Sequence, residues 1–452
     1  MPENSPSVPL ATTTTGPGAA VPAKVPAAGQ HVPGRWRQLA VLSPTVLTDN
    51  SESSVVSTLF AAMRQTLGMS LSHLGLLQAL SRVTGAVSGP LWVAAARRAG
   101  RRSVLAGTGL WMGGWLAACG LSQNFAQLLT CYLLAAVGAA AGQPLVHDLV
   151  ADLFDEGSRG RAIGAMYGGV TLLGAVIGPL VAQLAEAPGG WRSGFCAVGA
   201  LCVLAALLVL FLFRDPGAGA SEATATAAHH TSGAFSRQTL RRLFGIRTFT
   251  LMVVQRLLSG HLLVAGFGVV FLTERGFGTA TAALVAIPSG VGYLLGSVAG
   301  GLVTDRVHRA DPEHGRVRTL QVLQLLYAGL AFLGTQIDWQ GIGAYLLLFG
   351  AMAAVQGANP GVNRPIVMAV TPPDLRGPAF AVLISVAEAL AYALFNLGAG
   401  ALGDALGLRT VFLWVLVVLM AVNALFCGLL HRTYPHDVAR ALDSAAQDAP
   451  GA

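Results

Sequence analysis

Residues 193–213 read SGFCAVGALCVLAALLVLFLF, an apolar stretch without a charged side chain. A helix of about 20 such residues crosses the hydrocarbon core of a bilayer. The rest of the chain has the same character, since 54% of its 452 residues are hydrophobic and only 11% are charged. Soluble proteins carry about 25% charged residues. The composition therefore excludes an ordinary soluble enzyme, a disordered protein and a small disulfide-linked scaffold, and it predicts an all-α membrane protein.

Twelve apolar stretches of suitable length follow one another along the chain. They lie at 38–62, 73–95, 103–122, 127–149, 162–185, 193–213, 248–272, 280–303, 319–336, 341–368, 378–402 and 408–431. Residues 158–162 (SRGRA), after the fourth stretch, match residues 375–379 (LRGPA), after the tenth. We therefore expect twelve transmembrane helices in two pseudo-symmetric six-helix bundles, as in transporters built from repeats.

The long loop 214–247, rich in Ala, Thr, Gly and Ser, separates the two sets of six stretches. We interpret it as a cytoplasmic linker between an N-terminal bundle over 35–213 and a C-terminal bundle over 248–432. Residues 1–34 are rich in Pro, Thr, Ala and Gly and lack the compact apolar core of a secretory signal. They predict a disordered cytoplasmic tail, and residues 433–452 predict a second cytoplasmic tail.

Arginine side chains gather in alternate loops, the pattern typical of loops on the cytoplasmic side. They are Arg97, Arg98, Arg101, Arg102, Arg159, Arg161, Arg214, Arg237, Arg241, Arg242, Arg247, Arg306, Arg309, Arg316 and Arg318. This pattern places both termini in the cytoplasm and explains the net charge of +7 without a nucleic-acid partner. Lys24 is the only lysine, and Ala and Gly are abundant, which indicates a GC-rich bacterial host. We therefore expect a multi-pass protein of the bacterial inner membrane.

Three segments resemble the major facilitator superfamily, and the resemblance covers residues 35–432. Residues 301–309 (GLVTDRVHR) are similar to the family's GxxxDRxxR loop signature. The first-half counterpart, 93–102, keeps the final Gly-Arg-Arg but has Arg97 where the family usually has Asp. Residues 174–179 (GAVIGP) resemble the GxxxGP core of a motif associated with antiporters and exporters. The resemblance implies a monomeric secondary transporter that works by alternating access.

Two narrower resemblances are partial. Leu134 stands where drug–proton antiporters have an arginine. Asp49 and residues 151–154 (ADLF) are similar to positions of Spinster-type lysolipid transporters, but Asn50 and Ala139 replace that group's Arg and Glu. The superfamily resemblance therefore does not select a subfamily.

Charged side chains at membrane depth cost about 2.5–3.5 kcal/mol on insertion scales, so each is a candidate for function. Asp49 and Glu52 stand three residues apart in the first stretch and share one helix face. Two close carboxylates in a low dielectric resist joint ionisation, so one would take up and release a proton, as proton coupling requires. Arg82 in the second stretch would bind an anionic substrate group, pair with these carboxylates, or do both in turn. The alternative is a static pair kept neutral by a neighbouring arginine.

The second set of stretches holds four further candidates. Arg256 lies about 13 Å into its helix, where it would bind a phosphate, sulfate or carboxylate or else extend to the cytoplasmic interface. Glu388 is the acidic candidate for proton coupling in this half and a candidate partner of Arg256. His261 would titrate physiologically or serve as hydrogen-bonded structure, and Asn359 would add a polar group to the substrate site.

A last group of residues is expected to act in gating. The acidic pair near the end of the fourth stretch would lock an inner gate to basic loops, and the GxxxDRxxR residues would act as a conformational switch. Glycine and proline would let the fifth stretch pack closely or bend. These residues are Asp148, Asp152, Asp305, Arg306, Gly174, Gly178 and Pro179.

Signatures of catalysis are absent from the sequence. It contains no GxxxxGK[ST] phosphate loop, no HExxH or clustered Cys/His metal site, and no serine nucleophile elbow. The five cysteines lie inside apolar stretches and are interpreted as small buried side chains. We expect no enzyme activity, no cofactor and no metal.

We expect the first of three functions, and the other two stay open as alternatives. The first is proton-coupled export of a small amphipathic or hydrophobic compound, drug-like or a lysolipid, through a largely apolar cavity with few charges. The second is uptake of an organic anion by proton symport, with Arg82 and Arg256 as the anion site. The third is a membrane sensor that keeps the fold without transporting. The expected partners are the substrate, protons and membrane lipid.

Overall fold

The computed structural model describes residues 34–187, 189–217 and 236–447. These residues fold into helices without strands, as the apolar stretches predict. The predicted tail over 1–34 lies outside the described residues except for Gly34, and so does most of the predicted linker. Residues 433–447 continue the last helix, and the remainder of the predicted C-terminal tail also lies outside the described residues.

The first seven helices, which we call the N half, make six spans. They are α1 (Arg35–Leu67), α2 (Leu71–Ala99), α3 (Arg101–Cys119), α4 (Phe125–Ala139), α5 (Gly142–Leu153), α6 (Glu156–Leu184) and α7 (Gly190–Leu212). Helices α4 and α5 together form the fourth span. Helix α3 packs between α4 and α7, and α1 contacts both α6 and α7.

The helices after residue 236, which we call the C half, make six more spans, several of them built from short consecutive pieces. They are α8 (Arg237–Phe244), α9 (Arg247–Leu257), a 3-10 turn (Gly260–Leu262), α10 (Leu263–Glu274), α11 (Thr279–Ala283), α12 (Ala286–Ala310), α13 (Gly315–Gln336), α14 (Ile342–Ala358), α15 (Pro360–Val370), a 3-10 turn (Pro373–Leu375), α16 (Arg376–Phe380), a π-helical segment (Ala381–Ala387), α17 (Glu388–Leu406), α18 (Leu408–Phe412), a second π-helical segment (Leu413–Val418), α19 (Leu419–Phe426), a 3-10 turn (Cys427–Leu429) and α20 (Leu430–Gln447).

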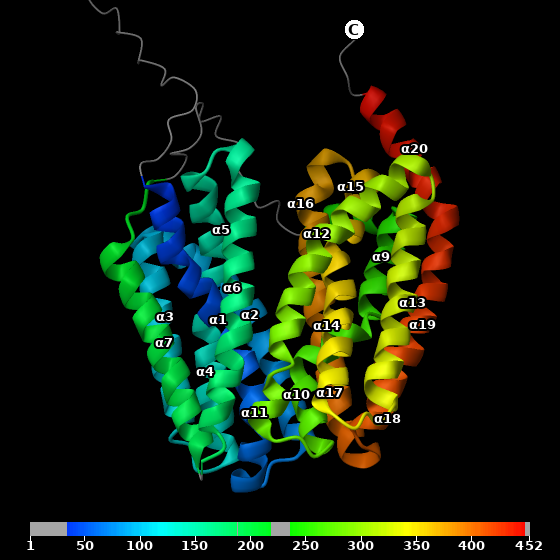
Figure 1. The fold of residues 1–452 in the computed structure, drawn as a ribbon. Helices are drawn as coiled ribbons and strands as arrows, with labels where there is room; N and C mark the ends of the chain where they lie inside the picture. The colour runs from blue at the N-terminus through cyan, green and yellow to red at the C-terminus, as the bar shows by residue number, and fades with distance from the viewer. Residues whose placement is uncertain (1–33, 188, 218–235, 448–452) are drawn as a thin grey trace, which may run out of the picture.

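Among the described residues, nine helical stretches are long and apolar enough to cross a membrane. Helices α1, α2 and α3 are more polar, yet they lie alongside the others in the N half (Figure 1). The architecture is therefore the predicted one, with twelve membrane helices in two bundles.

Two spans are interrupted at equivalent positions of the two halves. The fourth span breaks between α4 and α5, just before Gly142, and the tenth breaks at Asn359, between α14 and α15. Gly142 precedes Arg159 by the same number of residues as Asn359 precedes Arg376, the two arginines of the matching segments. Interrupted helices in matching positions are typical of substrate sites in transporters built from repeats.

The two halves meet at one end of the molecule, the closed end, opposite to the end that bears α20 and the beginning of α1 (Figure 1). Helices α2 and α17 cross there so closely that a Cβ atom on Gly75 would overlap the Asn396 carbonyl. The Asp404 carboxylate of α17 accepts hydrogen bonds from the backbone N–H groups of Leu71 (2.8 Å) and Ser72 (2.9 Å). One half thus caps the first helical turn of α2 in the other half, which supplies partners for two otherwise unbonded N–H groups.

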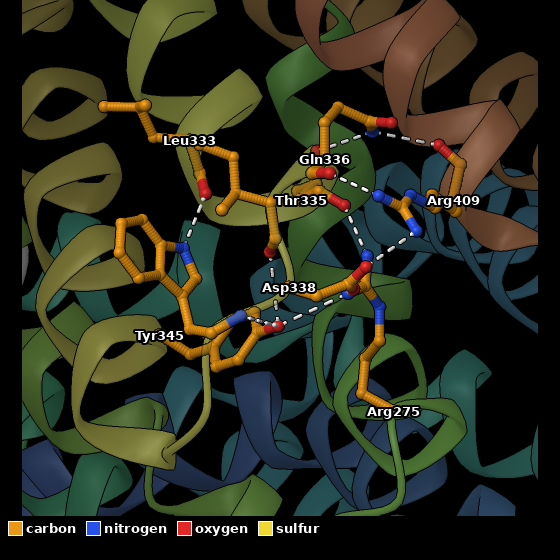
Figure 2. Close-up of polar contacts among 9 residues, drawn as sticks. Arg275, Leu333, Thr335, Gln336, Asp338, Tyr345 and Arg409 are labelled. Atoms are coloured by element: carbon orange, nitrogen blue, oxygen red, sulfur yellow. Dashed lines mark hydrogen bonds and ion pairs between the residues drawn. The ribbon is translucent and has the colours of Figure 1, made fainter.

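Figure 2 shows how the C half is held together at the same end. Arg275, after α10, pairs with Asp338 and donates a hydrogen bond to the Thr335 carbonyl (2.6 Å). Asp338 also pairs with Arg409 (3.1 Å), which donates to the Gln336 carbonyl. Three connections between helices share these bonds, so the C half is tied together at its closed end.

Candidate functional site

A cavity of about 730 Å³, the central cavity, lies between the halves where α2 and α17 diverge. Toward the closed end these helices touch, and the Tyr392 hydroxyl donates a hydrogen bond to Gln78 Oε1 (2.8 Å). Beyond that contact the lining includes Asp49, Glu52, Arg82 and Glu388. The expectation of a largely apolar cavity with few charges is therefore wrong here, because α1, α2 and α17 turn four charged side chains toward one space.

Asp49 and Glu52 lie on the face of α1 that meets the break in the fourth span. A Cβ atom on Gly142, the first residue of α5, would overlap the Asp49 carboxylate, so this approach requires glycine. Glu52 is 8% exposed. Among the described residues, Asp49 Oδ2 and Glu52 Oε2 are buried without a hydrogen-bond partner. A buried carboxylate oxygen without a hydrogen-bond partner is costly when charged.

Arg82 faces the same cavity from α2 and is exposed to it. Its guanidinium carbon lies 4.5 Å from the centre of the Tyr392 ring, a cation–π contact from the opposite half. Within the described part of the chain Arg82 makes no ion pair with Asp49, Glu52 or another carboxylate. Its charge is therefore held in place by an aromatic ring and stays available to an anion.

A smaller cavity of about 200 Å³, the C-half recess, adjoins the central cavity and shares Tyr293 and Glu388 with it. The structure brings Arg256 and Glu388 together, with Nη2 and Oε2 2.6 Å apart. The buried His261 lies edge-on to Tyr327, with ring centres 5.8 Å apart.

Asn359, at the break in the tenth span, also lines the recess. Its Oδ1 accepts a hydrogen bond from Gln324 Nε2 (3.1 Å), so protein groups already occupy part of its bonding capacity. Arg364 lines the recess as well, is exposed, and makes no ion pair among the residues that the structure describes.

The predicted gate residues Asp148 and Asp152 both pair with Arg101 of α3, at 3.1 Å for Asp148. Arg101 also pairs with Asp215 (2.6 Å), which follows α7. Burial alone would raise the pKa of Asp215, but the hydrogen bond and the charge of Arg101, together with the backbone N–H of Gly217, outweigh burial and lower this pKa below its usual value. All these pairs lie within the N half, so they fasten α3, α5 and the chain after α7 to one another.

The other predicted gate residues occupy two separate places. Asp305 and Arg306 are exposed near the end of α12 and make no ion pair among the described residues. Gly174 on α6 faces Leu47 of α1, and Gly178 faces Ala286 of α12 in the other half, in both cases at ordinary contact distance. Pro179 lies inside α6, which continues to Leu184.

The comparisons with known proteins agree with this geometry. A sequence profile of the Major Facilitator Superfamily matches residues 45–386. The chain belongs to this superfamily. The sequence therefore predicts the family correctly, and this family consists of multi-pass membrane transporters rather than enzymes.

Sequence relatives within the superfamily fall into two groups. The 4-hydroxybenzoate transporter PcaK of Pseudomonas putida is 29% identical over 180 residues, which is 39% of this chain and 39% of PcaK. The multidrug resistance protein MdtG of Citrobacter koseri is 26% identical over 283 residues, which is 61% of this chain and 66% of MdtG. The chain thus matches less than two thirds of the length of either relative.

Solved structures of superfamily members share the fold. The inward-facing, occupied crystal structure of a bacterial homologue of the human lysosomal transporter Spinster has a TM-score of 0.75 at 19% identity, covering 90% of this chain and 98% of that chain. The crystal structure of a D-xylose–proton symporter has a TM-score of 0.65 at 17% identity, covering 86% of this chain and 96% of that chain.

Sequence reasoning missed several residues of the candidate site. Gly142 holds the space for Asp49, Gln143 lines the central cavity beside it, and Tyr392 holds Arg82. One signal was present, because Gly142, Gln143 and Pro144 interrupt an apolar span with a polar and a helix-breaking residue. Tyr392 carries no such signal, since aromatic residues are ordinary in apolar helices.

Proposed function

We propose that this chain is a proton-coupled symporter that takes up a small organic anion by alternating access. The observation that carries the proposal is Arg82, which faces the central cavity without an ion pair, next to two carboxylates with unpartnered buried oxygens. Arg82 is the anion site, and Asp49 and Glu52 carry the proton. Arg256 and Glu388 form a polar wall that orients the anion from the C half.

The charge balance of the cavity supports symport. When Asp49 or Glu52 is ionised, its negative charge balances Arg82. When that carboxyl takes up a proton, Arg82 loses this balance and attracts the carboxylate of a substrate in its place. Proton binding and anion binding therefore favour each other, and this reciprocal coupling moves both in the same direction.

The proposal includes an orientation. The arginine-rich loops place Gly34 and α20 in the cytoplasm of a bacterial cell, so the central cavity is turned toward the cytoplasm and the α2–α17 contact closes the outer side. Rocking of the two halves would then transfer access to the outer side. The functional unit of the proposal is a monomer, since both walls of the cavity come from one chain.

Proton-coupled export of an amphipathic or hydrophobic compound is the second candidate. The same carboxylates support it if the compound is a cation, because a cation and a proton would then compete for Asp49 and Glu52, as antiport requires. MdtG, which is named a multidrug resistance protein, supports it as well. The two candidates predict opposite effects of pH on binding.

The test uses purified protein in liposomes that contain a pH-sensitive dye. Benzoate is the anionic probe, chosen because PcaK is named for a hydroxybenzoate, and tetraphenylphosphonium is the cationic probe. We expect inward benzoate movement to acidify the lumen, and benzoate binding to tighten by up to about tenfold for each pH unit that the medium is lowered.

Asp49→Asn or Glu52→Gln should abolish this acidification, whereas Glu186→Gln, an exposed carboxylate after α6, should not. Proton release driven by tetraphenylphosphonium, with binding that weakens at low pH, would instead establish the export candidate. Binding of either probe without any flux would favour a non-transporting sensor.

A further inference from the structure

A second cavity lies inside the N half and is not part of the central cavity. It has a volume of about 300 Å³ and is lined by residues of α1, α5, α6 and α7; we call it the side chamber. Its lining is rich in aliphatic side chains, and no charged side chain lines it in the described part of the chain. Among the lining residues are Leu47, Val55, Val170, Ile177, Val181 and Leu201.

Helix α1 separates the two spaces. Asp49 and Glu52 line the central cavity, whereas Leu47 and Val55 line the side chamber. The two faces of one helix therefore adjoin compartments of opposite polarity, one charged and one uncharged.

Gln143 connects the compartments, because its side chain lines both. Its Oε1 accepts a hydrogen bond from the hydroxyl of Tyr167 (2.7 Å), which also lines the chamber. The same hydroxyl lies 3.1 Å from His147 Nε2. A hydrogen-bonded amide next to the helix break thus stands between the two cavities.

We infer that the side chamber receives the apolar part of the transported anion, which enters past Gln143 where the two spaces adjoin, while the carboxylate stays with Arg82. The inference rests on the proposed function for the anionic group and adds the substrate class, a carboxylate with an aryl or short alkyl tail. The size supports it, since an apolar cavity of about 150 Å³ binds benzene. A chamber of about 300 Å³ therefore holds a phenyl ring together with several methylene groups.

The test compares benzoate, 3-phenylpropanoate and 5-phenylpentanoate by equilibrium binding to the purified full-length protein. Each methylene group that brings the ring into the chamber should tighten binding roughly fourfold. Ile177→Trp, which fills the chamber, should weaken 5-phenylpentanoate binding by about tenfold or more and leave benzoate binding within about twofold. Val176→Trp is the matched control, because Val176 is the neighbouring residue on α6 and is 51% exposed.

A second variant covers the case in which Ile177→Trp does not fold. Ile177→Ala enlarges the chamber and should shift the preference toward tails longer than that of 5-phenylpentanoate. An affinity that does not depend on tail length in wild-type protein would overturn the inference, as would equal losses for all three probes in Ile177→Trp. An acyl chain of a membrane lipid as the permanent occupant would give the first of these results.

A neutral probe separates this inference from the proposed function. 5-Phenylpentan-1-ol lacks the carboxylate, so it should bind wild-type and Val176→Trp protein but not Ile177→Trp, whether or not Arg82 binds anions. If the alcohol follows this pattern while benzoate fails to bind, the proposed function is wrong, but the side chamber is still a binding site for apolar groups. If the alcohol binds equally to all three proteins, the chamber assignment fails.

Discussion

The two walls of the central cavity carry charge in different ways. In the C half, Arg256 and Glu388 form an ion pair at 2.6 Å. In the N half, Arg82 rests on the Tyr392 ring, and Asp49 and Glu52 each keep one buried oxygen without a partner. Among the described residues, the arginine and glutamate of the C-half wall therefore form an ion pair, whereas the arginine of the N-half wall forms none.

This difference affects how readily each arginine can bind a substrate anion. An arginine already bonded to a carboxylate must lose that bond before it binds an anion, whereas an arginine without an ion pair does not. A cation–π contact contributes about 0.5–2 kcal/mol, and a hydrogen bond to a charged group contributes about 1.5–3 kcal/mol. A substrate carboxylate bonded to Arg82 can therefore make up for the loss of the ring contact. Under the proposed function, the exchange of proton and substrate therefore belongs to the N-half wall.

The largest expected effect comes from replacing the arginine of each cavity wall in turn. Arg82→Gln removes a charged hydrogen-bond donor worth about 1.5–3 kcal/mol and should weaken benzoate binding by about 10- to 150-fold. Arg256→Gln should weaken it by less than about threefold, because Arg256 is already occupied by Glu388. Calorimetry on the two variants measures both values. Equal losses would mean that the paired arginine exchanges as readily as the unpaired one.

The next prediction concerns the space that Gly142 leaves for Asp49. Gly142→Ala should displace the Asp49 carboxylate, since the new Cβ would overlap it. We expect proton-coupled uptake to fall by about tenfold, while stability changes by no more than about 1 kcal/mol because a side chain, not backbone, has to move. Dye-monitored uptake and thermal unfolding measure the two effects.

Gly164→Ala, on α6, is the control for that substitution, because a Cβ atom there meets nothing within 4 Å. Uptake by Gly142→Ala at the level of this control would show that the position of Asp49 is not critical.

The smallest expected effect on transport comes from replacing Arg101, and it compares two arginines of the N half, Arg101 and Arg82. Unlike Arg82, Arg101 is fully engaged, with Asp148, Asp152 and Asp215 as partners. Arg101→Gln should lower stability by about 1–3 kcal/mol and leave benzoate affinity within about twofold. Unfolding and binding assays on the same preparation test this separation, and a large loss of affinity with unchanged stability would contradict it.

The stability loss in Arg101→Gln should also depend on pH. The hydrogen bond and the charge of Arg101, with a backbone hydrogen bond from Gly217, together overcome the effect of burial and lower the pKa of Asp215. Its stabilising contribution is therefore complete above the unfolded pKa of about 4 and disappears as the pH falls through the lowered value. The difference between variant and wild-type protein should stay constant from about pH 5 to pH 8 and shrink below about pH 4.

Several features of the site could be predicted from the sequence because they depend on local spacing. The separation of Asp49 and Glu52 places them on one helix face, and the scarcity of charge in the spans singles out Arg82, Arg256 and Glu388. The partners could not be predicted in the same way. Arg82 lines one cavity with the carboxylates of α1, but its contact with the Tyr392 ring joins residues that lie far apart in the sequence.

The sequence by itself determined the class of the protein, the number of its spans and its membership of the Major Facilitator Superfamily, because hydropathy and short motifs are properties of neighbouring residues. Only the tertiary structure decided which charges are paired, where Gly142 makes room for Asp49, and that an uncharged chamber adjoins the charged cavity. The reason is geometric: a helix's periodicity defines its faces, but the rotation and tilt of each helix against its neighbours decide what those faces meet.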